Sequence, residues 1–360
     1  MRKILIITNH SYMLYRFRLE LIRELMKTNE VVLSMPFVGH EEDFQALGLR
    51  CIDTAVDRRG INPKTDFKLF CFYQKLLKQE KPDLVITYSI KPNIYAGLAC
   101  SLANIPFCAN VQGLGTAFQK KGLAQFVALL YKTAFAKVQT VFFENEGNAK
   151  EFCDRTGLPS GKRTVLSGAG INLDQYPYRE YPNHDVTHFL YLGRIMKEKG
   201  MDELFTAVER LHADGEAFML DLVGFFEDEY KDRVAELEKQ GIVKFHGFQQ
   251  DPHPFYAEAD CVVLPSYHEG MSNVLLEGAA TGRPLITSRI HGCMEAVKEE
   301  ESGYLCTVKD SDSLYEAMKQ FLHLSRQERI DMGHSGRRHI EETFDKRKVV
   351  EATIHALKLR

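Results

Sequence analysis

Two glutamates in the segment HEGMSNVLLEG (residues 268–278) have the type and spacing to bind sugar hydroxyls. A strand is predicted to end near Pro265 and a helix to begin near Ser272, which is a good N-cap residue. Glu269 then precedes the helix and Glu277 lies inside it. Because a carboxylate accepts two hydrogen bonds from a vicinal diol, one glutamate is expected to bind ribose hydroxyls and the other sugar hydroxyls.

The start of the same helix adds backbone donors. Free N–H groups at a helix start point outward at the positive end of the helix dipole and form an anion site. The amides concerned belong to Gly270, Met271, Ser272 and Asn273. Together with the glutamates they would hold a nucleotide-sugar. The spacing leaves a structural alternative open, in which Glu269 favours the helix dipole and Glu277 forms a surface ion pair.

A second loop, in YLGRIMKEKGMDEL (residues 191–204), carries two cations after a predicted strand. Gly193 ends that strand, Arg194 and Lys199 follow, and a helix is predicted to start near Met201. Arg can chelate a diphosphate and Lys supplies a point charge, so the loop suits a pyrophosphate group. A solvated basic loop is the alternative.

The elements that position these loops alternate between strand and helix along the whole chain. Apolar strands are expected at 3–8, 30–35, 83–88, 105–111 and 140–143, and again at 187–193, 217–224, 242–247, 261–265 and 284–287. This predicts an α/β fold with two doubly wound parallel-sheet (Rossmann-like) domains that face a cleft. The expected boundaries are an N-terminal domain 1–170, a linker 171–186 and a nucleotide-sugar-binding domain 187–343. A C-terminal helix at about 344–360 is expected to pack back on the first domain.

The two loops together resemble a known family, the retaining family-4 glycosyltransferases of the GT-B architecture. The matching residues are Gly193-Arg194, Lys199-Gly200, Glu269-Gly270 with Glu277, then Gly282 and Pro284, and the stretch SGAGINLDQY (167–176). The resemblance implies that Arg194 and Lys199 bind the diphosphate, Glu269 the donor sugar and Glu277 the ribose. It also implies front-face attack with retention of configuration, no metal ion, no cofactor and a UDP-sugar donor. No metal-ligand cluster stands out in the sequence, since Asp310 in Asp310-Ser311-Asp312 is a better N-cap than a ligand.

The acceptor side departs from the family pattern. Many members have a Gly-Gly loop after the first strand, where this chain has Thr8 to Tyr12, and a His after the fifth strand, where it has Gln112. Gln cannot carry a proton but can hydrogen-bond a sugar hydroxyl. The other candidates that follow strands of the first domain are His10, Tyr88, Lys91 and Asn93.

Charge and composition bear on the acceptor. Residues 1–180 hold 24 Lys+Arg against 17 Asp+Glu (+7), which leaves 22 against 32 (−10) for the rest of a chain with net charge −3. Residues 118–137 carry an apolar stripe beside four lysines. No apolar run is long enough for a membrane span or a signal peptide, so a cytoplasmic protein is expected, and its basic first half could meet phosphates, nucleic acid or an anionic membrane face. The sequence resembles bacterial capsule and O-antigen glycosyltransferases, which implies a lipid-linked acceptor of the undecaprenyl-diphosphate type in surface polysaccharide biosynthesis and peripheral attachment to the inner face of the cell membrane.

Two other functions remain open from the sequence. A nucleotide-sugar epimerase of the same architecture would bind the same donor without an acceptor. A non-catalytic nucleotide-binding or nucleic-acid-binding protein is the second, although the acidic second half opposes nucleic acid as a partner.

Overall fold

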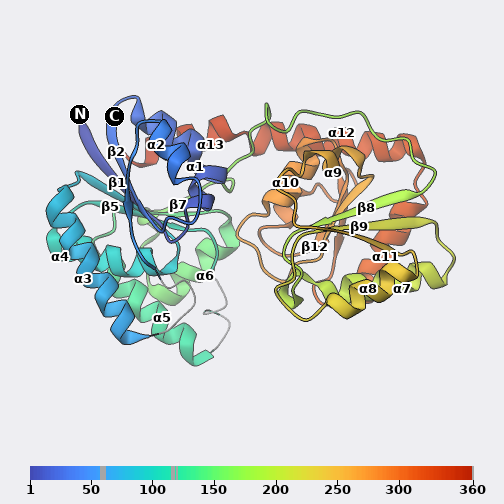
Figure 1. The fold of residues 1–360 in the computed structure, drawn as a ribbon, viewed down its shortest axis with the longest axis horizontal. Helices are drawn as coiled ribbons and strands as arrows, with labels where there is room; N and C mark the ends of the chain where they lie inside the picture. The colour runs from blue at the N-terminus through green and yellow to red at the C-terminus, as the bar shows by residue number, and fades with distance from the viewer. Residues whose placement is uncertain (57–61, 115–117, 119–120, 359–360) are drawn as a thin grey trace. The chain divides into compact units, whose positions relative to one another are not determined.

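The structure is a computed structural model that describes residues 1–56, 62–114, 118 and 121–358, without the side chains of Lys121 and Leu123. The chain divides into two compact units, Met1–Ala169 with Arg347–Arg360, and Gly170–Lys346 (Figure 1). Each unit is a parallel sheet with helices on both faces. The α/β class predicted from the alternating pattern is therefore confirmed.

The first unit contains a seven-stranded parallel sheet of order β3-β2-β1-β4-β5-β6-β7. Its strands are β1 (Arg2–Ile7), β2 (Asn29–Met35), β3 (Arg50–Asp53), β4 (Leu84–Tyr88), β5 (Phe107–Val111), β6 (Thr140–Phe143) and β7 (Arg163–Val165). The central strands β1, β4 and β5 are buried on both sides, as their continuous apolar runs require. The order in which strands are added to the sheet reverses between β1 and β4, so the loops after these two strands lie at the switch point of the sheet.

Helices cover both faces of this sheet. One face is covered by α3 (Pro63–Glu80), the π-helical turn Pro92–Ala96 with α4 (Gly97–Ala103), α5 (Lys121–Ala134) and α6 (Glu146–Thr156), which share one hydrophobic core. The other face is covered by α1 (Ser11–Met26), α2 (Glu41–Ala46) and the C-terminal α13 (Lys346–Ala356). Val349 and Leu357 place the end of the chain in the same core as Leu14 and Ile22 of α1.

The second unit contains a six-stranded parallel sheet of order β10-β9-β8-β11-β12-β13. Its strands are β8 (Thr187–Leu192), β9 (Phe218–Val223), β10 (Val243–Gly247), β11 (Cys261–Leu264), β12 (Leu285–Ser288) and β13 (Gly303–Cys306). The helices are α7 (Met201–Ala213), α8 (Lys231–Lys239), α9 (His253–Glu258), α10 (Asn273–Ala280), α11 (Ser311–Leu322) and α12 (Arg326–Thr343). Figure 1 shows α9, α10 and α12 on one face of this sheet and α7, α8 and α11 on the other.

The segment expected to be a linker runs along the second unit. Tyr181 is buried there and donates a hydrogen bond to the carbonyl of Asp260 at 2.9 Å. The buried Arg283 donates to the carbonyls of Arg179 and Glu180 at 2.9 and 2.8 Å. These contacts replace solvent for the backbone of an irregular segment, which is why a stretch without periodicity is nevertheless ordered.

Neither a membrane-spanning helix nor a metal-binding cluster is found in the described residues. Of the helices in the described residues, none combines the length and apolar character that a membrane span requires. Those residues also contain no group of three or more His, Cys, Asp or Glu side chains placed to hold a metal ion. Asp310 is the N-cap of α11 and accepts hydrogen bonds from the amides of Asp312 and Ser313, as predicted.

Candidate active site

The two loops singled out in the sequence meet because their strands are neighbours. β8 and β11 are hydrogen-bonded in the sheet of the second unit, so the loops at their carboxyl ends lie side by side. Lys199 Nζ from the first loop forms an ion pair with Glu269 Oε1 from the second. Ser266 Oγ donates a second hydrogen bond, 2.8 Å long, to the same oxygen. Two residues separated by 70 positions thus form one site.

Two glycines allow close backbone approach around this site. Gly200 follows Lys199 with φ +76°, and a Cβ there would lie 2.1 Å from the carbonyl oxygen of Pro265 in the loop after β11. Gly292, in the loop after β12, has φ +88°, and its Cβ would lie 2.5 Å from the carbonyl oxygen of Gly270. Any other residue at these positions would force the loops apart, because heavy atoms do not approach so closely. Gly200 therefore allows the loops that carry Lys199 and Glu269 to meet, and Gly292 lets the loop after β12 pack against the Glu269 loop.

Arg194 lies at the edge of the same site. Its side chain is 45% exposed, and its Nη1 is 3.7 Å from Glu227 Oε2 in the loop after β9. The Arg194 carbonyl accepts a hydrogen bond from the Tyr191 hydroxyl at 2.6 Å, and Gly193 N–H donates to Val223 O at 2.9 Å. The backbone around Arg194 is therefore fixed while its guanidinium stays accessible to solvent.

The start of α10 differs in part from the prediction. Ser272 is the N-cap, as expected, and its Oγ accepts from the amide of Leu275. The Ser272 N–H donates to the carbonyl of Gly292 at 2.8 Å, so the prediction that this amide binds an anion is wrong for the structure as it stands. Met271 is buried beneath the loop, while Gly270 and Asn273 are half-buried.

Glu277 is inside the protein and not in a surface ion pair. Its exposed fraction is 5%, and its Oε2 accepts a hydrogen bond of 2.9 Å from the hydroxyl of Tyr256 in α9. Tyr256 is itself fully buried and packs edge-on against Tyr176. The structural alternative for Glu277 is excluded, since a carboxylate at this depth requires polar partners.

Neutral groups surround the charged pair. Burial, and then the charge of Glu269, raise the pKa of the Tyr191 hydroxyl well above its usual value. The same two causes raise the pKa of the Cys293 thiol, which lies behind the loop. Both groups stay protonated at neutral pH. A ligand at this site would therefore meet the charges of Lys199, Glu269, Arg194 and its partner Glu227, and uncharged Tyr191 and Cys293.

The candidates of the first unit have different surroundings. Tyr88 and Asn93 are almost fully buried, and both amide atoms of Asn93 are bonded within the core, to Thr87 Oγ1 and the carbonyl of Asn110. Lys91 Nζ pairs with Asp66 Oδ1 at 2.7 Å. These contacts position the loop after β4, and the expectation that Tyr88 and Asn93 line an open acceptor site is not met.

His10 and Gln112 are half-buried at the carboxyl ends of β1 and β5. The His10 ring lies 6.1 Å from the ring of Tyr12, centroid to centroid. Gln112 Nε2 lies 3.7 Å from the sulfur of Met13. Both remain candidates for contact with an acceptor.

Sequence reasoning missed the residues that orient the glutamates. Tyr256 lies 21 positions before Glu277 in another helix, so no local pattern connects them. Ser266 lies three positions before Glu269, and a polar residue that close in a strand-end loop was a usable signal.

The sequence also did not predict an aromatic pair next to the site. The ring of Phe248, exposed after β10, packs edge-on against the exposed Phe225 after β9.

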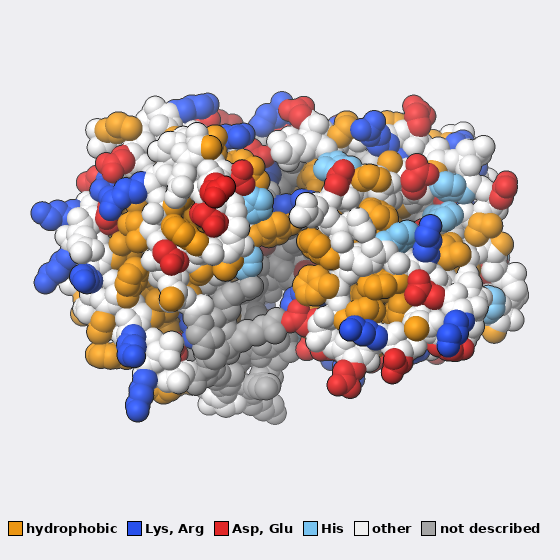
Figure 2. Space-filling model, in the orientation of Figure 1, with side chains coloured by type: hydrophobic (Ala, Val, Ile, Leu, Met, Phe, Trp, Pro, Cys, Tyr) orange, Lys and Arg blue, Asp and Glu red, His pale blue; other side chains and the backbone are white. Residues whose placement is uncertain are grey.

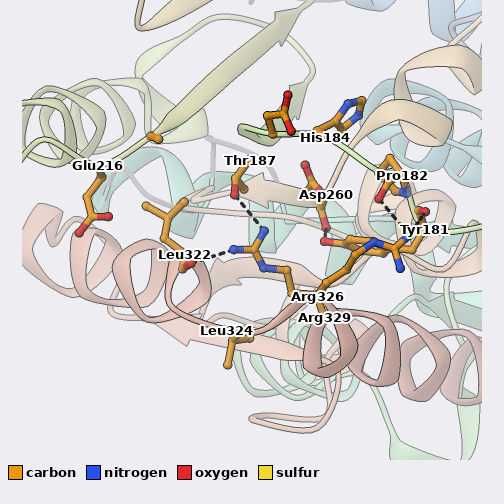
Figure 3. Close-up of a pocket in the computed structure, with 12 residues that line it drawn as sticks. Tyr181, Pro182, His184, Thr187, Glu216, Asp260, Leu322, Leu324, Arg326 and Arg329 are labelled. Carbon is orange, nitrogen blue, oxygen red and sulfur yellow. Dashed lines mark hydrogen bonds between the residues drawn. The ribbon is translucent and has the colours of Figure 1, made fainter.

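A separate cavity of about 330 Å³ lies at the opposite edge of the same sheet (Figure 3). Thr187 and Asp260, at the amino ends of β8 and β11, line it together with Arg326 and Arg329 of α12. Arg329 donates to Thr187 Oγ1 and to the carbonyl of Leu322 at 2.9 and 2.8 Å. The cavity is therefore distinct from the Lys199–Glu269 site.

Comparison with known proteins gives matches over both units. Residues 178–339 match the family model "Glycosyl transferases group 1", and residues 3–145 match "Glycosyl transferase 4-like". Among curated proteins, the chain is 30% identical over 328 residues to the N,N'-diacetylbacillosaminyl-diphospho-undecaprenol alpha-1,3-N-acetylgalactosaminyltransferase of Campylobacter jejuni, with 86% of each chain covered. It is 26% identical over 288 residues to the UDP-Gal:alpha-D-GlcNAc-diphosphoundecaprenol alpha-1,3-galactosyltransferase of Escherichia coli, with 72% of this chain and 71% of that one covered.

Two solved structures share the fold. Anabaena Alr3699/HepE in complex with UDP superposes with a TM-score of 0.80 at 16% identity, covering 99% of both chains. WaaG, a glycosyltransferase involved in lipopolysaccharide biosynthesis, superposes with a TM-score of 0.75 at 16% identity, covering 99% of this chain and all of that one (100%).

Proposed function

The chain belongs to the family-4-like glycosyltransferases of the GT-B architecture, and we propose that it transfers a hexose or N-acetylhexosamine from a UDP-sugar to a lipid-linked glycan. The observation that carries the proposal is the pairing of Lys199 with Glu269 at the carboxyl ends of adjacent strands. The relatives named above support the acceptor, since both act on glycans linked to diphospho-undecaprenol.

Binding of the donor would change the ion pairs within this site. A diphosphate can replace Glu269 as the anionic partner of Lys199, and the accessible guanidinium of Arg194 can bind it bidentately. Glu269 is then released to accept hydrogen bonds from hydroxyls of the donor sugar. Glu277, oriented by Tyr256, is proposed for the ribose.

The proposed chemistry needs no nucleophile from the protein. The bond between the anomeric carbon and the diphosphate oxygen breaks, a bond to the acceptor oxygen forms on the same face, and the acceptor proton passes to the departing phosphate. Negative charge develops on the leaving diphosphate, so the cations of Arg194 and Lys199 lower the barrier by stabilising it. The product keeps the anomeric configuration of the donor. The family resemblance also implies that no metal ion takes part, so turnover should persist in excess chelator.

We place the reaction in bacterial surface polysaccharide biosynthesis, at the inner face of the cell membrane with peripheral attachment. The capsular polysaccharide biosynthesis glycosyltransferase CapM of Staphylococcus aureus, 26% identical over 310 residues, supports this context.

The test is transfer of labelled sugar from a panel of UDP-sugars to a diphospho-undecaprenol-linked sugar. At subsaturating donor, Arg194→Ala should reduce turnover by about 100-fold or more, in the range found for removal of one transition-state hydrogen-bond donor. Glu277→Ala should also reduce turnover under these conditions, mainly through a higher KM for the donor, because its contact with the ribose is made before the chemical step. Arg210→Ala is the matched control, because Arg210 is similarly exposed (43%, against 45%) and lies on α7 away from the site. Near-normal turnover by either site variant would remove that residue from the assignment.

The same assay separates the alternatives. An epimerase would convert the UDP-sugar in the absence of acceptor, and a non-catalytic binder would leave it unchanged with acceptor present. Proton NMR of the product reports the anomeric configuration, and inversion would contradict the front-face mechanism.

A further inference from the structure

One face of the first unit combines lysines with large exposed hydrophobic side chains. On α3 a stripe of exposed residues at helical spacing contains Lys64, Phe67, Lys68, Cys71, Lys75 and Lys78. The neighbouring α4 and α5 add Leu102, Phe126, Leu129 and Lys132. We call these ten residues the α3–α5 face. In Figure 2, blue and orange side chains lie next to one another on the side of the first unit where Figure 1 places α3 and α4.

The inward positions of the same helices already form the core. Leu69, Tyr73 and Leu76 of α3 and Val127 and Tyr131 of α5 are buried in one hydrophobic cluster. Most of the apolar stripe that the sequence shows in residues 118–137 is thus a core face. Among the described side chains of the stripe, Phe126 is the exception, with 55% of its surface exposed, and Phe67 and Leu129 are 65% and 60% exposed. These outward side chains are not needed for packing.

The charge on this face is one-sided. The two carboxylates of α3, Asp66 and Glu80, turn inward and are paired, Asp66 with Lys91 and Glu80 with Lys3 and Arg50. Residues 84–143, which include α4 and α5, contain no Asp or Glu.

The lysines of the face have no partner of opposite charge among the residues that the structure describes. Within the described residues, no side-chain ion pair involves Lys64, Lys68, Lys75, Lys78 or Lys132. The face therefore attracts anions over its whole extent.

We propose that the α3–α5 face docks the enzyme on an anionic lipid bilayer. Lysines near the headgroups of acidic lipids gain electrostatic energy together, because the bilayer is continuous along the roughly 27 Å length of an 18-residue helix. Isolated rings and a leucine between such lysines can enter the interface without a complementary pocket. An acidic protein partner would match the charge but would need a complementary pocket for each of Phe67, Phe126 and Leu129, whereas a bilayer interface accepts them at any position.

Docking would bring the enzyme to its lipid-linked acceptor, and only this role of the face rests on the proposed function. Its physical basis is the charge and exposure of the face itself. The two can therefore fail separately.

Sedimentation with vesicles of phosphatidylcholine, with and without phosphatidylglycerol, tests the electrostatic part. The wild type should bind the anionic vesicles at about 0.1 M salt and be released towards 1 M, where the Debye length falls to about 3 Å. The triple variant Lys68→Ala/Lys75→Ala/Lys78→Ala should bind roughly 100-fold more weakly, or about fivefold per lysine.

The matched control is Lys231→Ala/Lys239→Ala/Lys298→Ala, which removes the same charge from exposed sites of the second unit. It should bind the vesicles like the wild type. Equal loss in both triple variants would show that net charge alone drives binding and would overturn the assignment to this face. No binding by the wild type would overturn the proposal altogether.

A fluorescence experiment tests insertion of the apolar side chains. The chain contains no Trp, so a single substitution creates a unique indole reporter. Emission of Phe126→Trp should shift to the blue on anionic vesicles and be quenched by brominated acyl chains. Val186→Trp, on the second unit, should show neither effect. Unquenched Phe126→Trp in the vesicle-bound protein would contradict insertion.

Transfer to a water-soluble, short-chain acceptor separates docking from function. The lysine variant should retain wild-type turnover in solution and lose it on acceptor embedded in anionic vesicles. Loss of turnover in solution with a folded variant would overturn the separate docking role. Vesicle binding by a wild type that transfers no sugar would leave docking intact and contradict the proposed function.

Discussion

At the scale of single residues, the sequence predicted the two glutamates and Lys199, but not the hydroxyl groups that orient the glutamates. Glu269 and Glu277 stand out by type and spacing in a loop and the helix after it. The groups that orient them, Lys199, Ser266 and Tyr256, come from the neighbouring loop, the same loop and another helix. The sequence could predict Lys199 through the family resemblance. Tyr256 depends on how α9 packs on α10, which no local pattern encodes.

The hydroxyl of Tyr256 should position Glu277. Tyr256→Phe removes one buried hydrogen bond to a carboxylate, so the free energy of unfolding should fall by about 1–3 kcal/mol. KM for the donor should rise more than kcat falls, because the ribose contact is made before the chemical step.

Denaturant unfolding and steady-state kinetics measure the two effects of Tyr256→Phe. Tyr315→Phe removes a hydroxyl that donates to the exposed Asp214, and it should change neither quantity appreciably. An unchanged KM in Tyr256→Phe would show that Tyr256 has only a structural role.

At the scale of elements, the sequence predicted the strands with apolar runs and missed three short strands at sheet edges. All strands expected from the pattern are present, and the structure adds β3, β7 and β13. All three lie at the edge of a sheet and have three or four residues, and the side chains of β3 and β7 are partly exposed. A short edge strand is stabilised by pairing with its neighbour, so its own sequence need not show a continuous apolar run.

Three strands of the second unit are also joined by polar side chains. Asp221 in β9 bonds with Oδ2 to His188 Nδ1 in β8 and with Oδ1 to His246 Nε2 in β10, both at 2.7 Å. The hydrogen bond to Asp221 raises the pKa of His188 against the opposing effect of burial; Asp260 adds to the rise and Lys244 opposes it. Burial alone would raise the pKa of Asp221, but the two histidines outweigh it and the pKa is lowered.

This cluster predicts a pH window of stability. A lowered carboxyl pKa stabilises the fold above the ordinary value of 3.8, and a raised imidazole pKa stabilises it below the ordinary value of 6.5. Asp221→Asn should therefore lower the free energy of unfolding most between pH 3.8 and pH 6.5, by about 1–3 kcal/mol. The loss should become smaller as the pH rises through the raised pKa of His188 or falls below 3.8.

Urea unfolding across pH measures the effect of Asp221→Asn. Asp251→Asn breaks an exposed pair with His253 and should cost less than about 1 kcal/mol at any pH. A cost of Asp221→Asn that does not vary with pH would contradict the electrostatic origin.

At the scale of the whole molecule, the chain enters the second unit at Gly170 and leaves it at Lys346. A parallel bridge between Ile171 and Asp345 joins the entry and exit points, with hydrogen bonds from Ile171 N–H to Phe344 O and from Lys346 N–H to Ile171 O at 2.8 and 3.0 Å. The last helix then belongs to the core of the first unit. The sequence predicts a C-terminal helix that packs back on the first domain, whereas its position beside α1 depends on contacts between residues far apart in the chain.

Single substitutions should destabilise the hydrophobic core of each unit separately. Leu357→Ala removes a fully buried side chain beside α1, and it should cost about 2–5 kcal/mol through the cavity it leaves. Amide hydrogen exchange should accelerate in β1, β2 and α1 and stay unchanged in β8 and β9.

The reverse pattern is expected for Leu314→Ala, whose side chain is buried in the second unit. Equal acceleration in both units by either variant would contradict independent cores.

The return of α13 to the first unit sets an order of events during protein synthesis. The first 169 residues leave the ribosome long before residues 347–358, and at about 5–20 residues per second the intervening unit takes on the order of 10–35 s to make. Throughout that interval the apolar surface of α1 that later receives Val349 and Leu357 is uncovered. The hydrophobic core of the first unit therefore stays incomplete until α13 has been synthesised. We expect a chaperone that covers α1 during translation to raise the yield of folded enzyme.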